Sequence, residues 1–248
     1  SAQYFGQKNH NGVRDVFRMK ILIGITIIAI SLSVMIFLHK PLINMFLHEG
    51  SSSGNIQETF NYAKNYLYIM VIGIAPFVIS NCYSTTLKES GQTVVPMKAG
   101  VLAVVFDIVL NYIFIFGKLG FPAMGVVGAA IATVISRFVE CGYLVIYTHR
   151  HSNDYPFIKH CYRTLKVPGS LVKKIIVTGA PLMLNEFLWA GGLTLQTQAL
   201  STKGLATVGG LNICNTIGNI SNCIFVTMGT TIAIVVGQLL GAGKLKER

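Results

Sequence analysis

Six runs of predominantly apolar residues, separated by shorter polar segments, dominate the sequence. A hydrocarbon core about 30 Å thick needs about 20 apolar residues per helix, whereas buried strands of soluble proteins are usually only about four to eight residues long. The runs are therefore too long for strands, and they predict an all-α membrane protein with six transmembrane helices. They cover approximately residues 19–38, 63–82, 97–117, 123–147, 172–200 and 207–237.

The distribution of charge gives these runs an orientation. The chain is 52% apolar and 12% charged, with a net charge of +11, whereas soluble domains are typically about 25% charged. Lys and Arg gather in residues 1–20, near Lys88 and Lys98, in the loop after the fourth run and in the tail. The positive-inside rule then predicts that both ends are cytoplasmic, in agreement with an even number of spans. Basic loops that alternate with spans indicate membrane lipid rather than nucleic acid as a partner.

A short internal repeat predicts the architecture. Gln3-x-x-Gly6 near the start is matched by Gln238-x-x-Gly241 near the end, and both copies lie where a span meets the cytoplasm. Because six helices separate them, the copies have the same orientation and indicate parallel repeats related by an axis along the membrane normal. The basic loop 148–170 divides residues 1–147, the last four helices of a first lobe, from residues 171–248, the first two helices of a second.

Several further runs carry a family resemblance. They are residues 87–97 (LKESGQTVVPM), 106–111 (FDIVLN), 117–133 (GKLGFPAMGVVGAAIAT), 179–186 (GAPLMLNE) and 237–243. With these runs the chain resembles the MATE (multidrug and toxin extrusion) family of transporters. The resemblance implies a two-lobed, twelve-helix protein of the cell membrane, of which this chain is a fragment covering about the third to eighth helices. The missing helices of the same transporter would be its partners, and the family's first helix, which often carries a cation-coupling acid, precedes it.

Ionisable residues within the spans are candidates for function, because each costs about 3 kcal/mol at the bilayer centre. Asp107 and Asn111 share a face one helical turn apart; hydrogen bonding within the lobe and a cation-linked role both remain open. Arg137 and Glu140 are predicted to form a structural ion pair. The resemblance places Glu186 beside a central cavity, where it would bind a cation or substrate, or else be buried as a neutral acid.

Two helix faces combine further polar residues. Asn212, Asn215, Asn219 and Asn222 line one face of the sixth span, either as hydrogen-bonding contacts between helices or as the wall of an aqueous cavity. On the fifth span, Trp189 and Gln196 share a face with Glu186, a combination that suits a flat organic cation. Pro76 and Pro181 bend their helices, as static kinks or as gating hinges.

The remaining candidate chemistry is sparse. His149, His151, His160 and Cys161 match no zinc-binding spacing and predict a solvated, lipid-facing cationic loop without a metal site. The five cysteines are expected to be buried as small hydrophobes. No phosphate-binding loop and no cofactor motif is found, so the energy source is predicted to be a proton or sodium gradient.

Three functions follow from these features. The first is antiport, in which an inward cation (H⁺ or Na⁺) drives export of organic cations or drugs. A lipid-linked precursor flippase is the alternative, but it would need a strongly cationic cavity, and Arg137 is the single cation that lies away from the ends of the six runs. An intramembrane enzyme would need a catalytic histidine with its partners, and no run contains a histidine.

Overall fold

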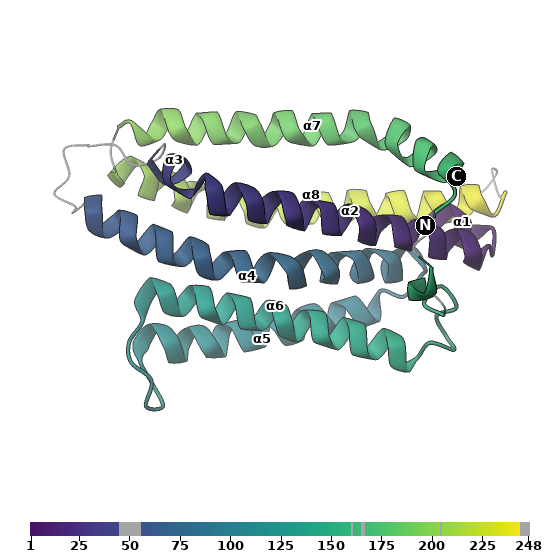
Figure 1. Cartoon of the computed structure of the whole chain (residues 1–248), viewed down its shortest axis with the longest axis horizontal. Helices are drawn as coiled ribbons and strands as arrows, with labels where there is room; N and C mark the ends of the chain where they lie inside the picture. The colour runs from purple at the N-terminus through teal and green to yellow at the C-terminus, as the bar shows by residue number, and fades with distance from the viewer. Residues whose placement is uncertain (45–55, 160, 165–166, 204, 244–248) are drawn as a thin grey trace. The chain divides into compact units, whose positions relative to one another are not determined.

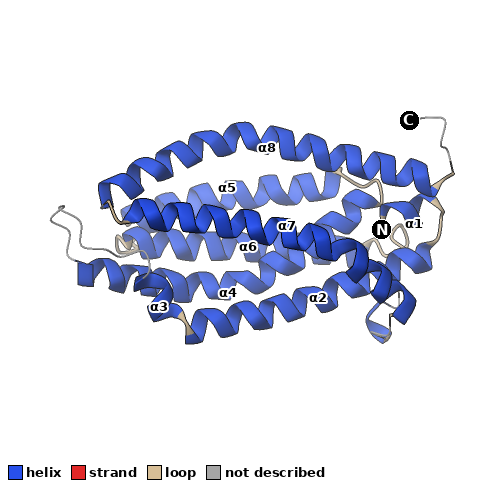
Figure 2. Ribbon diagram, turned by 90° about the horizontal axis from the view of Figure 1, so that it is seen from above, coloured by secondary structure: helices blue, strands red, loops and turns tan. Residues whose placement is uncertain are grey.

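Helices make up the described part of the chain. The computed structural model describes residues 1–44, 56–159, 161–164, 167–203 and 205–243, and these ranges contain no strand (Figure 2). The all-α prediction is confirmed. The helices are α1 (Ala2–Gly6), α2 (His10–Phe37), α3 (His39–Asn44), α4 (Ile56–Glu89), α5 (Val94–Phe116), α6 (Gly125–Arg150), the 3₁₀ turn η1 (Cys161–Arg163), α7 (Gly169–Ser201) and α8 (Leu205–Gly241).

Most of these helices are able to cross a membrane. By length and composition, five helices of the described chain qualify: α2, α4, α5, α6 and α8. The 33-residue helix α7 coincides with the predicted run 172–200 but falls outside this set, because Asn185, Glu186 and Gln196 lower its hydropathy. The apolar helices make this a multi-pass membrane protein, in which α7 carries the most polar of the six predicted spans.

The helices form two compact units. The first unit contains Ser1–Ile36, Asn65–Val167 and Ala233–Arg248, and the second contains Phe37–Lys64 and Pro168–Ile232. The boundary at Pro168 lies within the loop 148–170. Helix α8 contributes to both units, with its final turns belonging to the first.

Glycines set the close pairing of α5 and α6, which run side by side (Figure 1). Gly117 ends α5 with a left-handed backbone (φ 65°), and a Cβ there would lie 2.6 Å from the backbone nitrogen of Ala123. A Cβ on Gly128 of α6 would lie 2.7 Å from the carbonyl oxygen of Phe114. Both positions therefore require glycine, and the tight turn between them brings Asp107 opposite Ser136.

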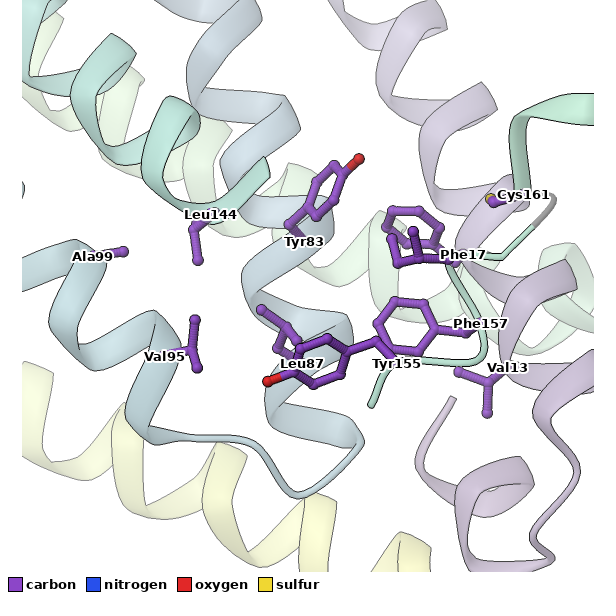
Figure 3. Close-up of a cluster of buried hydrophobic side chains, with 11 residues drawn as sticks. Val13, Phe17, Tyr83, Leu87, Val95, Ala99, Leu144, Tyr155, Phe157 and Cys161 are labelled. Atoms are coloured by element: carbon purple, nitrogen blue, oxygen red, sulfur yellow. The ribbon is translucent and has the colours of Figure 1, made fainter. Parts of the chain in front are cut away.

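Several side chains of the loop between α6 and α7 (the α6–α7 loop) are buried inside the first unit instead of being solvated. Tyr155, Phe157 and Cys161 are at most 5% exposed, and they join a buried apolar cluster with side chains of α2, α4, α5 and α6 (Figure 3). The Phe17 ring makes edge contacts with Tyr83 and Phe157, at centroid distances of 5.1 and 5.7 Å. The prediction of a solvated loop is wrong for these residues. Burial of the large apolar rings of Tyr155 and Phe157 is more favourable than the hydration that the charged residues of the loop would gain by keeping them at the surface.

Hydrogen bonds attach the same loop to α2. The buried Arg18 side chain donates through Nε to the Cys161 carbonyl oxygen at 2.9 Å, and its Nη1 lies 3.2 Å from Asp15 Oδ1. Burial raises the pKa of the Cys161 thiol, and the nearby Arg18 opposes this rise only in part. Cys161 is therefore an inert, packed thiol at neutral pH.

The other cysteines correct the expectation that all five are buried. Cys82 and Cys141 are half-buried, and Cys214 and Cys223 are exposed on α8. A small apolar side chain on a membrane helix is as stable in contact with lipid as in a protein core. Apolar neighbours in the sequence therefore do not show whether a cysteine is buried in the protein or exposed on a helix surface.

Candidate functional site

Asp107 is the centre of a hydrogen-bonded group between α5 and α6. Its Oδ2 accepts a hydrogen bond from Asn111 Nδ2 at 3.0 Å, and its Oδ1 accepts one from Ser136 Oγ at 3.2 Å. Ser136 Oγ also lies 2.8 Å from the carbonyl oxygen of Thr133, one turn earlier in α6. The helical spacing of Asp107 and Asn111 thus brings them together as the sequence suggests, and α6 supplies a further polar group.

Arg137 and Glu140 lie beside this group on α6. Arg137 Nη1 is 3.9 Å from Glu140 Oε2, and the side chains are 40% and 22% exposed. The Arg137 guanidinium also stacks over the Phe77 ring of α4, 4.3 Å from its centroid. A long, partly exposed pair of this kind contributes little stability, about 0.2–1 kcal/mol, so it leaves Glu140 with free acceptor capacity.

These groups line one cavity, here called the Asp107 cavity, with a volume of ≈290 Å³. Gly100, Ala103 and Val104 of α5 form its small apolar wall, and Asp107, Thr133, Ser136, Arg137 and Glu140 form its polar side. A water molecule takes about 30 Å³ in liquid water, whereas drug-sized ligands occupy sites of about 300–1,000 Å³. The cavity therefore lies at the lower limit for a drug site, and it has room for a small ion with its waters.

The charge of the cavity has a definite sign. With both acids ionised, Asp107 and Glu140 carry two negative charges and Arg137 carries one positive charge, which leaves one net negative charge. In surroundings of low dielectric constant such an imbalance favours one monovalent cation or one proton. Hard cations prefer oxygen ligands, and the Asp107 carboxylate and the Ser136 hydroxyl, which are hydrogen-bonded to each other, both line this cavity.

The other predicted site residues lie in the second unit. Glu186, Trp189 and Gln196 are exposed on α7, and Asn215 and Asn219 are exposed on α8. Trp189 keeps 59% of its surface exposed. These exposed side chains are therefore available to water, ligand or other helices.

The predicted hinges and the histidines are placed as follows. Pro181 lies inside α7 and Pro76 lies inside α4 of the first unit. His149 stacks on Tyr162 and His151 on Tyr147, with centroid distances of 5.8 and 4.2 Å. His160 lies outside the described residues, and among those described no group of three metal-binding side chains occurs.

Sequence reasoning missed Ser136 and Thr133. Their signal is the spacing of polar residues in α6: Thr133, Arg137 and Glu140 recur at intervals of one helical turn, with Ser136 on the adjoining strip. Serine and threonine are common in membrane helices, where they bond back to the preceding turn. Composition alone therefore gave no reason to single them out.

Long apolar helices that line a cavity with ionisable, hydrogen-bonded side chains are typical of a polytopic membrane protein of the transport class. A family model described as MatE matches residues 1–113. The chain is 30% identical to the probable multidrug resistance protein NorM of Thermotoga maritima over 98% of its own length and 50% of that protein. It is 28% identical to a protein of the same name from Halalkalibacterium halodurans, over 99% and 52%.

A third relative is the probable multidrug resistance protein YoeA of Bacillus subtilis, 24% identical over 98% of this chain and 51% of that protein. The family match and these relatives together support the assignment of the chain to the MATE family of transporters. It spans about half the length of the curated relatives it matches.

Proposed function

We propose that this chain is part of a cation-coupled antiporter that exports organic cations or drugs across the cell membrane. The observation that carries the proposal is the Asp107 cavity, in which two carboxyl groups and one guanidinium group lie between two apolar helices. The names of the relatives, multidrug resistance proteins, support the drug as the exported substrate.

The two halves of the proposed reaction use different parts of the chain. A proton or sodium ion binds at Asp107, where Ser136 and Asn111 already orient the carboxylate. The drug binds against the exposed face of Glu186, Trp189 and Gln196 in the second unit, where an acid and a large aromatic ring suit a flat organic cation. Cation binding drives export because its affinity differs between the two access states.

The basic segments orient the protein in the proposed cycle. Both ends of this chain lie on the cytoplasmic side, where they contact anionic lipid headgroups, and the energy comes from the ion gradient without a further cofactor. Labelling of single cysteines at residues 8 and 118 with a membrane-impermeant reagent tests this orientation, since only position 118 should react from outside the cell.

The decisive experiment uses the complete transporter in proteoliposomes. Export of a fluorescent organic cation is measured with an imposed proton gradient or an imposed sodium gradient, together with the return flux of the ion. Asp107→Asn, which keeps the shape and removes the charge, should abolish export driven by either gradient. Asp154→Asn makes the same chemical change at an exposed residue of the α6–α7 loop and should leave export unchanged. Gradient-driven export by Asp107→Asn at the normal rate would refute the assignment of the coupling site.

A further inference from the structure

A second cavity of the first unit lies between α2, α4 and α6 and shares no lining residue with the Asp107 cavity. Figures 1 and 2 show α4 running between the other two helices. The cavity has a volume of ≈320 Å³, and its wall comes from residues 21–28 of α2, 78–83 of α4 and 141–145 of α6, together with Tyr162 of the α6–α7 loop. We call it the isoleucine cavity, because four isoleucines line it.

The wall of the isoleucine cavity offers almost nothing to a polar ligand. Apart from two tyrosines and two cysteines, its side chains are aliphatic. The hydroxyl groups of Tyr83 and Tyr162 are hydrogen-bonded to each other, and the Cys82 thiol donates to the carbonyl oxygen of Lys20 at 3.6 Å. A buried water needs about two to four polar partners, and cavities without them stay dry or take up apolar molecules. The isoleucine cavity therefore suits an apolar occupant.

The cavity opens onto the surface of the first unit. Two of its isoleucines, Ile25 of α2 and Ile79 of α4, are 55% and 40% exposed, whereas Tyr83 is buried. Both helices are long and apolar enough to cross a membrane. The exposed edge of the cavity is therefore placed to meet the hydrocarbon of the bilayer.

The volume of the cavity favours an acyl chain over a helix as its occupant. Residues 21–28 extend about 10 Å along α2, and a helical segment of that length, with its side chains, has a volume of about 800 Å³. This is more than twice the ≈320 Å³ of the cavity. An acyl chain is a single file of methylene groups, so part of one chain fits into the same space.

Aromatic rings close one end of the isoleucine cavity. Tyr162 stacks on His149 with a centroid distance of 5.8 Å, and the His149 ring lies 6.0 Å from that of Tyr83. Tyrosines are enriched at the level of the lipid headgroups, where the ring is in apolar surroundings and the hydroxyl is near water. The cavity thus begins at the headgroup level and extends from there toward the hydrocarbon.

The same end of the three helices is positively charged. Residues 14–20 of α2, 84–89 of α4 and 149–150 of α6 contain five Lys or Arg and two acids. Lys20, which directly precedes the lining residue Ile21, has its Nζ 2.6 Å from Glu89 Oε2, and Arg150 at the end of α6 is exposed. The excess of cations complements a negatively charged headgroup.

We propose that the isoleucine cavity binds one acyl chain of an anionic phospholipid, from the leaflet that meets the basic end of the first unit. The chain enters past Ile25 and Ile79, and the headgroup stays outside, beside His149 and Arg150. Because Tyr162 belongs to the α6–α7 loop, the bound chain also supports the packing of this loop. The site goes beyond the proposed antiport, since it uses neither the Asp107 cavity nor the face of Glu186.

Photolabelling of the complete transporter tests the site. The protein is reconstituted in phosphatidylcholine vesicles with an increasing fraction of phosphatidylglycerol that carries a diazirine on one acyl chain, and labelled peptides are identified by mass spectrometry. Labelling of residues 21–28, 78–83 and 141–145 should saturate, and unlabelled phosphatidylglycerol should displace it. Labelling around Val101, an exposed position of α5, should rise in proportion to the probe. The same diazirine on phosphatidylcholine should label the cavity about fivefold less, the effect of one cation beside the headgroup.

A filled cavity provides the matched control. Val145→Phe places a larger side chain in the wall and should remove the saturable labelling, whereas Val101→Phe makes the same change on the exposed face of α5 and should leave it intact. Displacement by unlabelled lipid is measured on the native protein, so it decides the question even if Val145→Phe does not fold.

Three results would overturn the lipid site. Labelling of the cavity that rises in proportion to the probe, as around Val101, would mean that only bulk lipid reaches these residues. Absence of label from the cavity would mean that another helix of the complete transporter covers it. Displacement of the probe by an exported organic cation, but not by phosphatidylglycerol, would make the cavity a drug site. Equal labelling by the two lipids would overturn the choice of an anionic headgroup.

Discussion

Asp107 and Glu186 are both acids near the middle of long helices, but they differ in hydrogen bonding and in exposure. In the first unit, Asp107 accepts hydrogen bonds from Asn111 and Ser136, so that α5 and α6 solvate the carboxylate between them. In the second unit, Glu186 is exposed on α7, and no hydrogen bond or ion pair to it occurs within the described residues. A carboxylate already held by protein oxygen and nitrogen atoms suits a small cation. One that is exposed beside an indole ring suits a larger cationic ligand.

Replacing Glu186 should give the largest effect that distinguishes the two acids. Glu186→Gln removes the charge opposite a cationic drug and should lower export about 100-fold, a change of about 2.7 kcal/mol, while cation binding at Asp107 persists. Export and ion binding are measured on the same complete transporter. A neutral substrate of similar size is the control, because it should be affected much less. Equal loss of ion binding in Glu186→Gln would mean that both acids belong to one cation site.

The face of α8 that carries Asn215 and Asn219 provides a second test, of whether the exposed side chains of the second unit line an aqueous cavity. If Asn219 lines an aqueous cavity, Asn219→Cys should react with a water-soluble maleimide at least about tenfold faster than native Cys214, because thiolate forms only where water reaches. Both positions are exposed in the second unit, but they lie on different sides of the helix. Equally slow labelling of the two would favour contact with lipid or with another helix.

Replacement of Arg137 tests how the net charge of the Asp107 cavity affects cation binding. Arg137→Gln changes the net charge from one negative to two, and should lower the cation concentration for half-maximal export about tenfold, equivalent to about 1.4 kcal/mol. The double variant Arg137→Gln with Glu140→Gln restores one net negative charge and should return the cation dependence to that of the parent. If Arg137 acts only as a structural partner of Glu140, both variants would lose stability without this shift.

The sequence predicted the features that depend on local periodicity. Runs of about 20 apolar residues determine the helices, and a separation of four residues brings Asn111 to Asp107. It did not predict the packing of Tyr155 and Phe157, because a loop has no period from which a buried face can be recognised. Their contacts with Phe17 join positions far apart in the chain.

The same limit applies to the site and to the repeat. Ser136 was not predicted because its hydrogen bond is to Asp107 of another helix, α5. The two residues meet because Gly117 and Gly128 allow the tight turn between α5 and α6. The Gln-x-x-Gly repeat was visible in the sequence as a sign of symmetry. That its two copies touch follows only from the position of α1 beside the end of α8, which no pattern within either copy encodes.

Ser136 gives the smallest and most specific test of how the first unit holds its acid. Ser136→Ala removes one of the two hydrogen bonds to Asp107, worth about 0.5–1 kcal/mol net, and should raise the cation concentration for half-maximal export about two- to fivefold. Water in the Asp107 cavity replaces part of the lost interaction, which keeps the effect below that of Arg137→Gln. Ser33→Ala is the matched control, since Ser33 Oγ donates back to the Ala29 carbonyl of its own helix at 2.8 Å and has no other hydrogen bond within the described residues. An unchanged cation dependence in Ser136→Ala would show that α5 alone solvates the carboxylate, and the contrast with Glu186 would then rest on Asn111.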